Sequence, residues 1–204
     1  MTNDNNKVSI VSCSDYDLQR VRNALFDALA PINGLDFVKP GMRVAIKANL
    51  VAAMQPQQAG TTHPALLAAL TQLLIERGAS VIIGDSPGGL YTPSALRHVY
   101  RTCGLTQAAE IGAVLNEDCS IEQIQFPQGH TARQFSCTGY LCHVDAIINF
   151  CKLKTHGMLR FSGAVKNLFG TIPGTMKPEY HFRYTSQDAF CNMLIDLNEY
   201  FKPA

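Results

Sequence analysis

Short apolar runs alternate with longer segments of helical periodicity through the first half of the chain. The runs at residues 8–12 (VSIVS), 43–50 (RVAIKANL) and 80–85 (SVIIGD) predict three β-strands. Each is apolar through its middle, which is typical of a strand buried on both faces. Because a helical segment separates each strand from the next, the pattern predicts right-handed crossovers and a parallel sheet covered by helices.

Three helices are predicted between and after these strands, each bounded by capping or turn residues. The first lies between Asp15, its expected cap, and the turn at Pro31 and Gly34; the second lies over residues 62–78 and the third over 92–104. The apolar face of the first helix consists of residues at helical spacing: Leu18, Val21, Leu25 and Leu29.

The second half of the chain is less regular. Residues 113–138 predict two or three short strands in the form of an inserted hairpin, and residues 144–150 (VDAIINF) predict another buried strand. Residues 151–184 show no long periodicity, whereas 186–201 predict a final amphipathic helix, after which the chain ends without a closing element.

Taken together, these patterns predict one α/β domain over residues 1–204. Its expected architecture is a mostly parallel sheet flanked by helices, in a Rossmann-like three-layer arrangement with a small inserted β-hairpin region. The missing closing element predicts that the chain is the N-terminal part of a longer protein.

The composition is that of a globular domain. The 204 residues are 47 % hydrophobic and 16 % charged, against a usual charged share of about 25 %, which excludes a disordered tail and a coiled coil. The net charge of +1 makes nucleic acid an unlikely partner. The start, MTNDNNKVSI, lacks the features of a signal peptide, and the apolar stretch at 64–75 is shorter than the ~20 residues that cross a bilayer. We therefore expect a cytoplasmic protein without a membrane partner.

Seven cysteines cannot all pair within one chain, and no two of them have the C-x-x-C spacing of a zinc or redox site. We expect reduced thiols that pack as small apolar side chains. A metal cluster built from Cys137, Cys142 and Cys151 is the alternative.

Polar side chains follow three of the predicted strands. They are Lys47 and Asn49 after the second strand, Asp85 and Ser86 after the third, and Asn149, Lys152, Lys154 and His156 after the strand at 144–150. Ligands bind at the carboxyl edge of an open parallel sheet, where loops and helix N-termini converge. Polar loops without a ligand are the alternative, but Lys47 directly follows an apolar run, where an exposed loop is not yet expected.

Basic residues concentrate in one segment. Residues 152–183 hold six Lys or Arg and one acid, so the segment carries +5 and the rest of the chain −4. Clustered cations among glycines favour a compact anion, a phosphate or a carboxylate. A solvated basic face is the alternative; nucleic acid is disfavoured because only Phe161 offers a stacking face between Lys152 and Lys166.

The sequence Gly84-Asp85-Ser86-Pro87-Gly88 matches the G-x-S-x-G nucleophile elbow. The elbow needs the backbone N–H of the residue after the serine, and proline has none. A glycine-rich turn that presents Asp85 and Ser86 to a ligand or a cation is the better interpretation, with plain turn chemistry as the alternative.

Other candidate chemistry is weaker. No Walker A motif or G-x-G-x-x-G is present. The histidines at 63, 156 and 181 with Asp85 fit no local metal site, so no metal ligand is assigned. The stretch at 163–170 (GAVKNLFG) predicts a short helix in which Lys166 and Asn167 face a site. A buried lysine has a lowered pKa and serves as a base or forms a Schiff base, which makes Lys166 and Lys47 candidates.

Several of these stretches together resemble the domain-of-unknown-function 362 family. They run in the family's order across most of residues 40–200 and are Lys47-Ala48-Asn49-Leu50, Thr62-His63-Pro64, Gly78-Ala79 with Val81 to Pro87, Lys152-Leu153-Lys154-Thr155-His156, and the stretch at 163–170. The family usually has proline where this chain has Ala48. The resemblance implies that a longer protein continues into the rest of the domain and a 4Fe-4S ferredoxin module; no cofactor is expected within this chain. A looser likeness, in architecture alone, is to the N-terminal domains of nickel-dependent lactate-racemase-type enzymes.

The first hypothesis is an enzyme domain that binds a small anionic molecule, its reaction left open between oxidoreductase and isomerase. His156, Lys166 and Asp85 are the candidate catalytic residues. The candidate ligand-binding residues are Lys47, Asn49, Thr62, Ser86, Lys152, Lys154, Asn167 and His181. The alternatives are a non-catalytic docking or scaffold module for a ferredoxin-like partner, and a metal-dependent enzyme; a homo-oligomer is left open.

Overall fold

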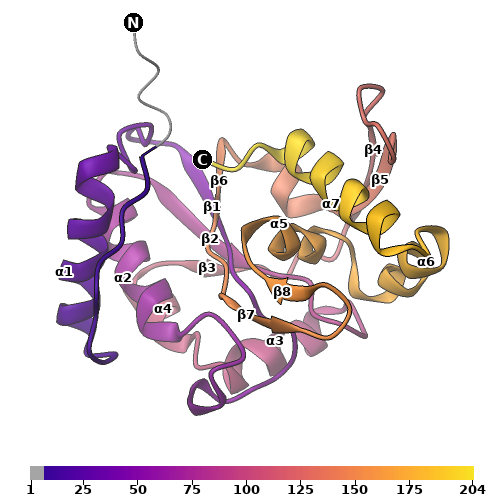
Figure 1. Cartoon of the computed structure of the whole chain (residues 1–204). Helices are drawn as coiled ribbons and strands as arrows, with labels where there is room; N and C mark the ends of the chain where they lie inside the picture. The colour runs from indigo at the N-terminus through magenta and orange to yellow at the C-terminus, as the bar shows by residue number, and fades with distance from the viewer. Residues whose placement is uncertain (1–6) are drawn as a thin grey trace, which may run out of the picture.

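A four-stranded parallel sheet forms the centre of the computed structural model, which describes residues 7–204 (Figure 1). Its strands are β1 (Arg43–Lys47), β2 (Ser80–Gly84), β3 (Val114–Leu115) and β6 (Ala146–Asn149), in the order β3-β2-β1-β6. The chain first builds outward from β1 to β2 and β3, then crosses to the other side of β1 to form β6. The strand order therefore reverses between β1 and β6, the position at which open α/β sheets bind ligands.

Helices cover both faces of the sheet, as the sequence predicts. They are α1 (Leu18–Leu29), α2 (Pro64–Ile75), α3 (Pro93–Thr102), α4 (Thr106–Ile111), α5 (Ala164–Asn167), α6 (Lys177–Arg183) and α7 (Gln187–Phe201), with 3-10 turns at Ala30–Ile32, Pro56–Gln58, Gly139–His143, Leu168–Thr171 and Gly174–Met176. In Figure 1, α1, α2 and α4 lie on one side of the sheet, and α5 and α7 lie on the other.

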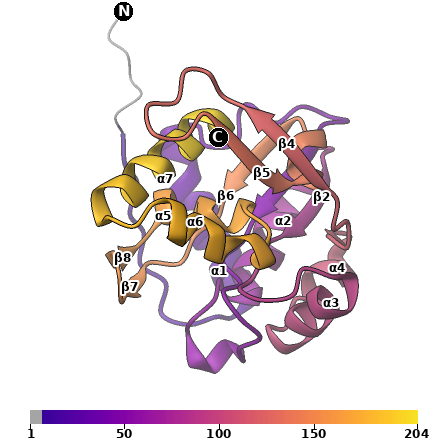
Figure 2. The same ribbon diagram turned by 90° about the vertical axis from the view of Figure 1, so that its right-hand side faces the viewer.

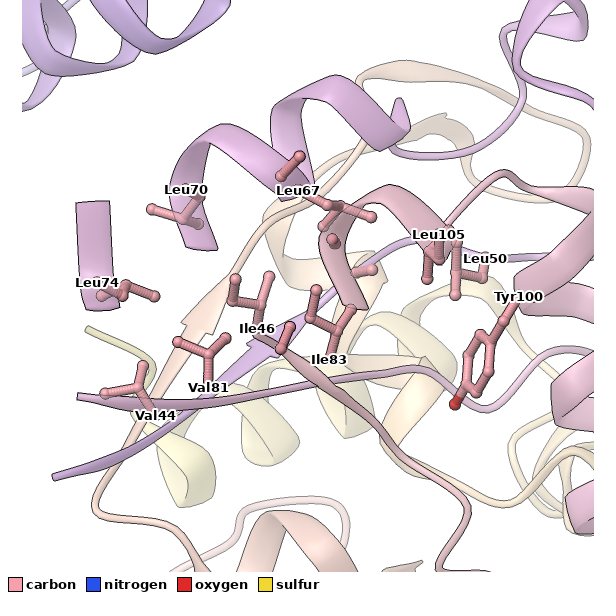
Figure 3. Packing of buried hydrophobic residues seen from close by; sticks show 14 of the residues in the cluster. Val44, Ile46, Leu50, Leu67, Leu70, Leu74, Val81, Ile83, Tyr100 and Leu105 are labelled. Carbon is pink, nitrogen blue, oxygen red and sulfur yellow. The ribbon is translucent and has the colours of Figure 1, made fainter. Parts of the chain in front are cut away.

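Alternation along the strands divides the apolar core between these two faces. Ile46 and Ile83 point toward α2, where they pack with Leu67 and Leu70 (Figure 3). The intervening residues, Ala45 and Ile82, point to the opposite face with Ile147, Tyr140 and Leu141. A strand buried on both faces reads as a continuous apolar run, which is why the sequence identifies these strands well.

Residues 8–12 do not form the predicted first strand. They pair with no strand in the described range 7–204, and the side chains of Val8 and Ile10 are 84 % and 91 % exposed. Their β-branched composition favours extended backbone, but a strand also needs a neighbouring ladder of hydrogen bonds. The N-cap of α1 is also corrected: Asp17, rather than Asp15, accepts the backbone N–H of Arg20, at 3.0 Å. The prediction of no signal peptide falls partly on residues 1–6, outside the described residues.

The predicted strand at 43–50 is shorter than its apolar run. From Asn49 onward the backbone N–H groups bond to side chains: that of Asn49 donates to Thr62 Oγ1 at 2.9 Å, and that of Leu50 donates to Asp85 Oδ2 at 2.6 Å. These residues stay buried although they have left the ladder. The end of β1 thus enters the loops that build the candidate site.

The inserted hairpin is confirmed. Strands β4 (Ile121–Gln125) and β5 (Gln134–Thr138) pair antiparallel and pack their apolar face against α7 (Figure 2). The hairpin loop is held by Asp196 of α7, whose carboxylate accepts the backbone N–H groups of residues 130, 131 and 132 at 3.0, 2.7 and 2.8 Å. A second hairpin, β7 (Lys154–His156) with β8 (Arg160–Ser162), lies in the segment without periodicity. Among residues 7–204, no helix is long and apolar enough to cross a membrane.

Candidate functional site

The candidate site lies at the carboxyl edge of the sheet, where the strand order reverses. Lys47 ends β1, Asn149 ends β6 and Asp85 directly follows β2. Asn167 of α5 joins these strand ends: its Nδ2 donates to Asn149 Oδ1 at 2.8 Å, and its Oδ1 accepts Nδ2 of Asn49 at 2.9 Å. One amide side chain therefore ties the ends of β1 and β6 together and fixes the base of the site.

A buried ion pair underlies the site. Lys47 Nζ lies 2.7 Å from Asp85 Oδ1, and the two residues are 0 % and 3 % exposed. The Asp85 carboxylate also accepts the backbone N–H of Leu50 at 2.6 Å and of Ser86 at 2.8 Å. A buried charge pair is tolerated when its remaining hydrogen-bonding capacity is satisfied, as it is here. A Cβ on Gly170 would lie 2.1 Å from Asp85 Oδ1, so only glycine fits beside the pair.

A cavity of about 200 Å³ opens above this pair. Three lysines from three elements line it: Lys154 of β7, Lys166 of α5 and Lys177 of α6. The other lining residues are Asn49, Val51, Asp85, Ser86, Gly88, His156, Ser162, Asn167, Phe169, Gly170 and His181. Asp85 is the only acidic side chain of the lining, and Lys47 already neutralises it.

The three lysines differ in how their ammonium groups are held. Lys154 Nζ donates to Asn49 Oδ1 at 2.8 Å and to the carbonyl of Gly60 at 2.5 Å. Lys177 Nζ donates to the carbonyls of Ser86 and Pro87. Two bonds leave one of the three ammonium hydrogens of each lysine for a ligand.

Lys166 Nζ, in contrast, has no hydrogen bond or ion pair to any residue of the range 7–204. It lies 4.8 Å from the centroid of the Phe169 ring, and Lys177 Nζ lies 5.9 Å from the same ring. The ring thus forms an apolar wall shared by two cations.

Burial and mutual repulsion perturb the titration of the site. Burial, followed by the charges of Lys47 and Lys154, lowers the pKa of Lys166 to about 8, although Asp85 opposes the shift. Burial, followed by the charges of Lys47 and Lys166, lowers the pKa of Lys177 to about 8 as well, again against Asp85. These shifts mark ammonium groups that are buried and repelled by neighbouring cations.

The two histidines are affected in the same sense. Burial lowers the pKa of His156, with further contributions from Lys166 and Lys154. Burial also lowers the pKa of His181, with further contributions from Lys166 and Lys177. Both imidazoles are therefore mainly neutral at pH 7. His156 Nδ1 accepts the N–H of Leu159 at 3.2 Å, so the neutral ring carries its proton on Nε2.

The structure brings most of the sequence-predicted site residues together around the cavity. They are Asn49, Asp85, Ser86, Lys154, His156, Lys166, Asn167 and His181. Lys47 lies beneath them in the ion pair. Thr62 and Lys152 do not line the cavity, and the Thr62 hydroxyl instead links Asn49 N to the carbonyl of Phe150.

Sequence reasoning does not single out Lys177. It belongs to the basic residues of 152–183, but no spacing indicates that its side chain reaches the loop at 86–87. Ser86 lies in the loop after β2 and not at a strand-to-helix elbow: its Oγ accepts the N–H of Gly174 at 2.7 Å, and α3 begins only at Pro93.

The cysteine and histidine alternatives find no geometric support in residues 7–204. No group of three or more His, Cys, Asp or Glu side chains there could hold a metal ion, so Cys137, Cys142 and Cys151 do not form a cluster. His63 lies away from the cavity, at the N-cap of α2, stacked on Tyr16 with ring centroids 3.5 Å apart. All seven thiols are free.

Comparison with known proteins agrees with the resemblance predicted from the motifs. The family model described as a domain of unknown function (DUF362) matches residues 44–204. A curated relative, the thylakoid-associated protein sll1697 of Synechocystis sp., is 32 % identical over 208 residues. The alignment covers 96 % of this chain and 60 % of that protein, so the chain spans about three fifths of the relative's length. The chain with the lysine-lined cavity therefore belongs to the DUF362 family.

Proposed function

We propose that this domain binds a small anion, through a phosphate or carboxylate group, in the lysine-lined cavity at the carboxyl edge of the sheet. One observation carries the proposal: Lys154, Lys166 and Lys177 converge on a cavity whose single carboxylate, Asp85, already pairs with Lys47 at 2.7 Å. Cations gathered without a counter-charge are costly, and a bound anion relieves that cost.

The size of the cavity limits the ligand. A volume of about 200 Å³ is smaller than the roughly 300–1,000 Å³ typical of pockets that enclose drug-sized molecules. It suits a phosphate group or a short carboxylic acid. A larger molecule would place only its anionic end inside.

The cavity also supports acid–base chemistry. The neutral His156 lines the cavity and carries its proton on Nε2, while Lys166 has a pKa of about 8. One donor and one titrating amine beside an anion site suit an enzyme that moves a proton on its substrate. Many oxidoreductases and isomerases use such groups, and we propose these two reaction classes.

A thermal-shift screen followed by calorimetric titration tests anion binding. Phosphate, sulfate and small carboxylates are titrated at low and moderate salt into the wild-type chain and the Lys154→Met, Lys166→Met and Lys152→Met variants. A ligand of the folded state raises Tm by mass action. Each charge-assisted bond contributes about 1.5–3 kcal/mol, so Lys154→Met is expected to weaken binding by roughly 10- to 100-fold.

Lys152→Met is the matched control, because Lys152 belongs to the same basic segment but does not line the cavity. It is expected to bind as the wild type does. Equal losses of anion affinity in the cavity variants and the control would assign the binding to the net charge of the segment. The absence of a Tm shift with any anion would refute the proposal.

Exposed apolar side chains favour a second candidate, a docking module for a partner such as a ferredoxin-like domain. Leu153, Phe161 and Phe182 are 69, 57 and 84 % exposed, and they lie on or beside the elements that carry the cavity lysines. Exposed apolar groups of this size mark interaction surfaces when they are contiguous. Analytical ultracentrifugation of the chain tests the idea, since a clean monomer at high concentration counts against such a surface.

The location of the protein is a separate proposal. We expect the cytoplasm, whereas the relative is named thylakoid-associated. Flotation of the chain with anionic and neutral vesicles distinguishes a free protein from one that associates with a membrane surface.

A further inference from the structure

The side-chain amine of Lys166 differs from those of the other cavity lysines in having no hydrogen bond to a protein oxygen of residues 7–204. The ammonium groups of Lys154 and Lys177 each donate two hydrogen bonds to protein oxygens, whereas Lys166 Nζ has no polar partner among residues 7–204. It lies over the face of the Phe169 ring, 4.8 Å from the centroid. An amine in this position is free to turn toward a molecule in the cavity.

The surroundings of this amine disfavour its protonation. Two other lysines and two histidines face the same cavity, and the only carboxylate is committed to Lys47. The lowered pKa of Lys166, about 8, leaves about a tenth of the amine neutral at pH 7. The usual lysine pKa of 10.5 would leave roughly 300 times less.

We propose that Lys166 forms an imine with the carbonyl carbon of a small 2-oxo acid, whose carboxylate is bound by Lys154 and Lys177. This inference rests on the proposed function, because the carboxylate must first enter the same cavity. It names the substrate class as a short molecule with a carbonyl group next to a carboxylate.

The step balances without an oxidant or a reductant. The lone pair of the neutral Lys166 Nζ adds to the carbonyl carbon, and the C=O π electrons move to oxygen. One proton of the resulting secondary ammonium passes to that oxygen, which gives the neutral carbinolamine. The nitrogen lone pair then expels the hydroxyl, which leaves as water with the second nitrogen proton, and the C=N bond forms. The neutral His156 lines the same cavity, where it can hydrogen-bond the oxygen without giving up its proton.

Geometry excludes the other lysines near the site as the nucleophile. Lys47 is fully buried in its ion pair. Lys177 also has a pKa of about 8, but its Nζ donates to two carbonyls that its attack would leave unpaired. Lys154 is held in the same way by Asn49 and Gly60.

Reductive trapping tests the proposal. The whole chain is incubated with pyruvate or glyoxylate and sodium cyanoborohydride, and the adduct is located by mass spectrometry of the intact chain and of its peptides. We expect roughly tenfold or more adduct at Lys166 than at any other lysine. Trapping should be lost in Lys166→Arg, retained in Lys152→Arg, and absent with acetate or lactate, which lack the carbonyl.

Acetaldehyde, which has the carbonyl but no carboxylate, should label Lys166 much more weakly. Lactate and pyruvate are also assayed by thermal shift without the reductant, on the wild type and Lys166→Arg. If both acids raise Tm and pyruvate leaves no adduct at Lys166, the imine is refuted while the anion site stands. If neither acid binds and no adduct forms, both proposals fall. Labelling spread over the surface lysines would also overturn the imine.

Discussion

Replacing Lys47 by methionine removes the ammonium beneath the cavity and keeps most of the side-chain volume. The Asp85 carboxylate then stays buried without its ion-pair partner, although it keeps the backbone N–H groups of Leu50 and Ser86 and the more distant charges of the cavity lysines. Breaking a buried pair in this way lowers the free energy of unfolding by about 3–5 kcal/mol. The two retained hydrogen bonds argue for the lower end of that range.

The loss is large enough to measure and small enough to leave a folded protein. For a domain of this size, each kcal/mol lowers Tm by roughly 2–4 °C, so Lys47→Met is expected to melt about 6–12 °C below the wild type. Urea unfolding supplies the free energy directly. Lys39→Met is the control, because Lys39 is exposed and outside the site, and it should change stability by less than about 0.5 kcal/mol.

A double-mutant cycle with Asp85→Asn tests the cause of the loss. Once Lys47 is gone, the second change removes the unpaired carboxylate charge, so the double variant should be more stable than the sum of the single losses predicts. A loss below about 1 kcal/mol in Lys47→Met, or additive losses in the cycle, would refute the description of a dry and tightly coupled pair.

Four further predictions concern the hairpin loop, the core and the titration of the cavity lysines. Asp196→Ala leaves three backbone N–H groups of the hairpin loop without their acceptor and should lower the free energy of unfolding by about 3 kcal/mol or more in urea melts, whereas an unchanged midpoint would show that water replaces the carboxylate. Gly84→Ala places a Cβ 2.7 Å from the Tyr140 ring within the core, so a Tm drop corresponding to about 1–3 kcal/mol is expected, and no drop would mean that the ring moves freely. Anion affinity in calorimetric titrations should fall between pH 7 and 9, because Lys166 and Lys177 lose their protons at about pH 8; a flat profile would remove them from the binding site. Both pKa values lie below the 10.5 usual for lysine, so the unfolded chain binds more protons than the folded chain from about pH 8 to 10.5. The contribution of these two lysines to the free energy of unfolding therefore rises with pH across that window. The rise should be smaller in Lys166→Met than in the wild type.

The order of helices and parallel strands is predictable from this sequence. Continuous apolar runs indicate strands that are buried on both faces, and helical periodicity indicates the helices between them. The same signal fails at residues 8–12, where an apolar run has no neighbouring strand to pair with. It also fails at β7 and β8, whose three-residue strands are too short to show an alternation. The first error concerns pairing with segments distant in the sequence, whereas the second concerns a local hairpin whose strands are short.

The location of the site is predictable for a topological reason. The carboxyl ends of parallel strands meet at one edge, so strand order and sequence position are enough to bring Asn49 and Asp85 to the same place. Which of the basic residues of 152–183 face the cavity does not follow from the sequence. Lys154 and Lys177 turn inward and Lys152 does not, and this depends on the path of the backbone through β7 and α6.

The contacts that enclose the cavity join residues far apart in the chain. Asn49 bonds to Asn167, which is 118 positions later, and Lys177 reaches back 91 positions to Ser86. The segment from β1 to β3 can pair locally during folding, but the cavity exists only after β7, α5 and α6 have docked on it. Closing such long loops is slow, so the cavity belongs to the last steps of folding and of synthesis on the ribosome. An anion that fills it would therefore act mainly on the rate of unfolding, lengthening the lifetime of the finished domain while leaving the rate of folding nearly unchanged.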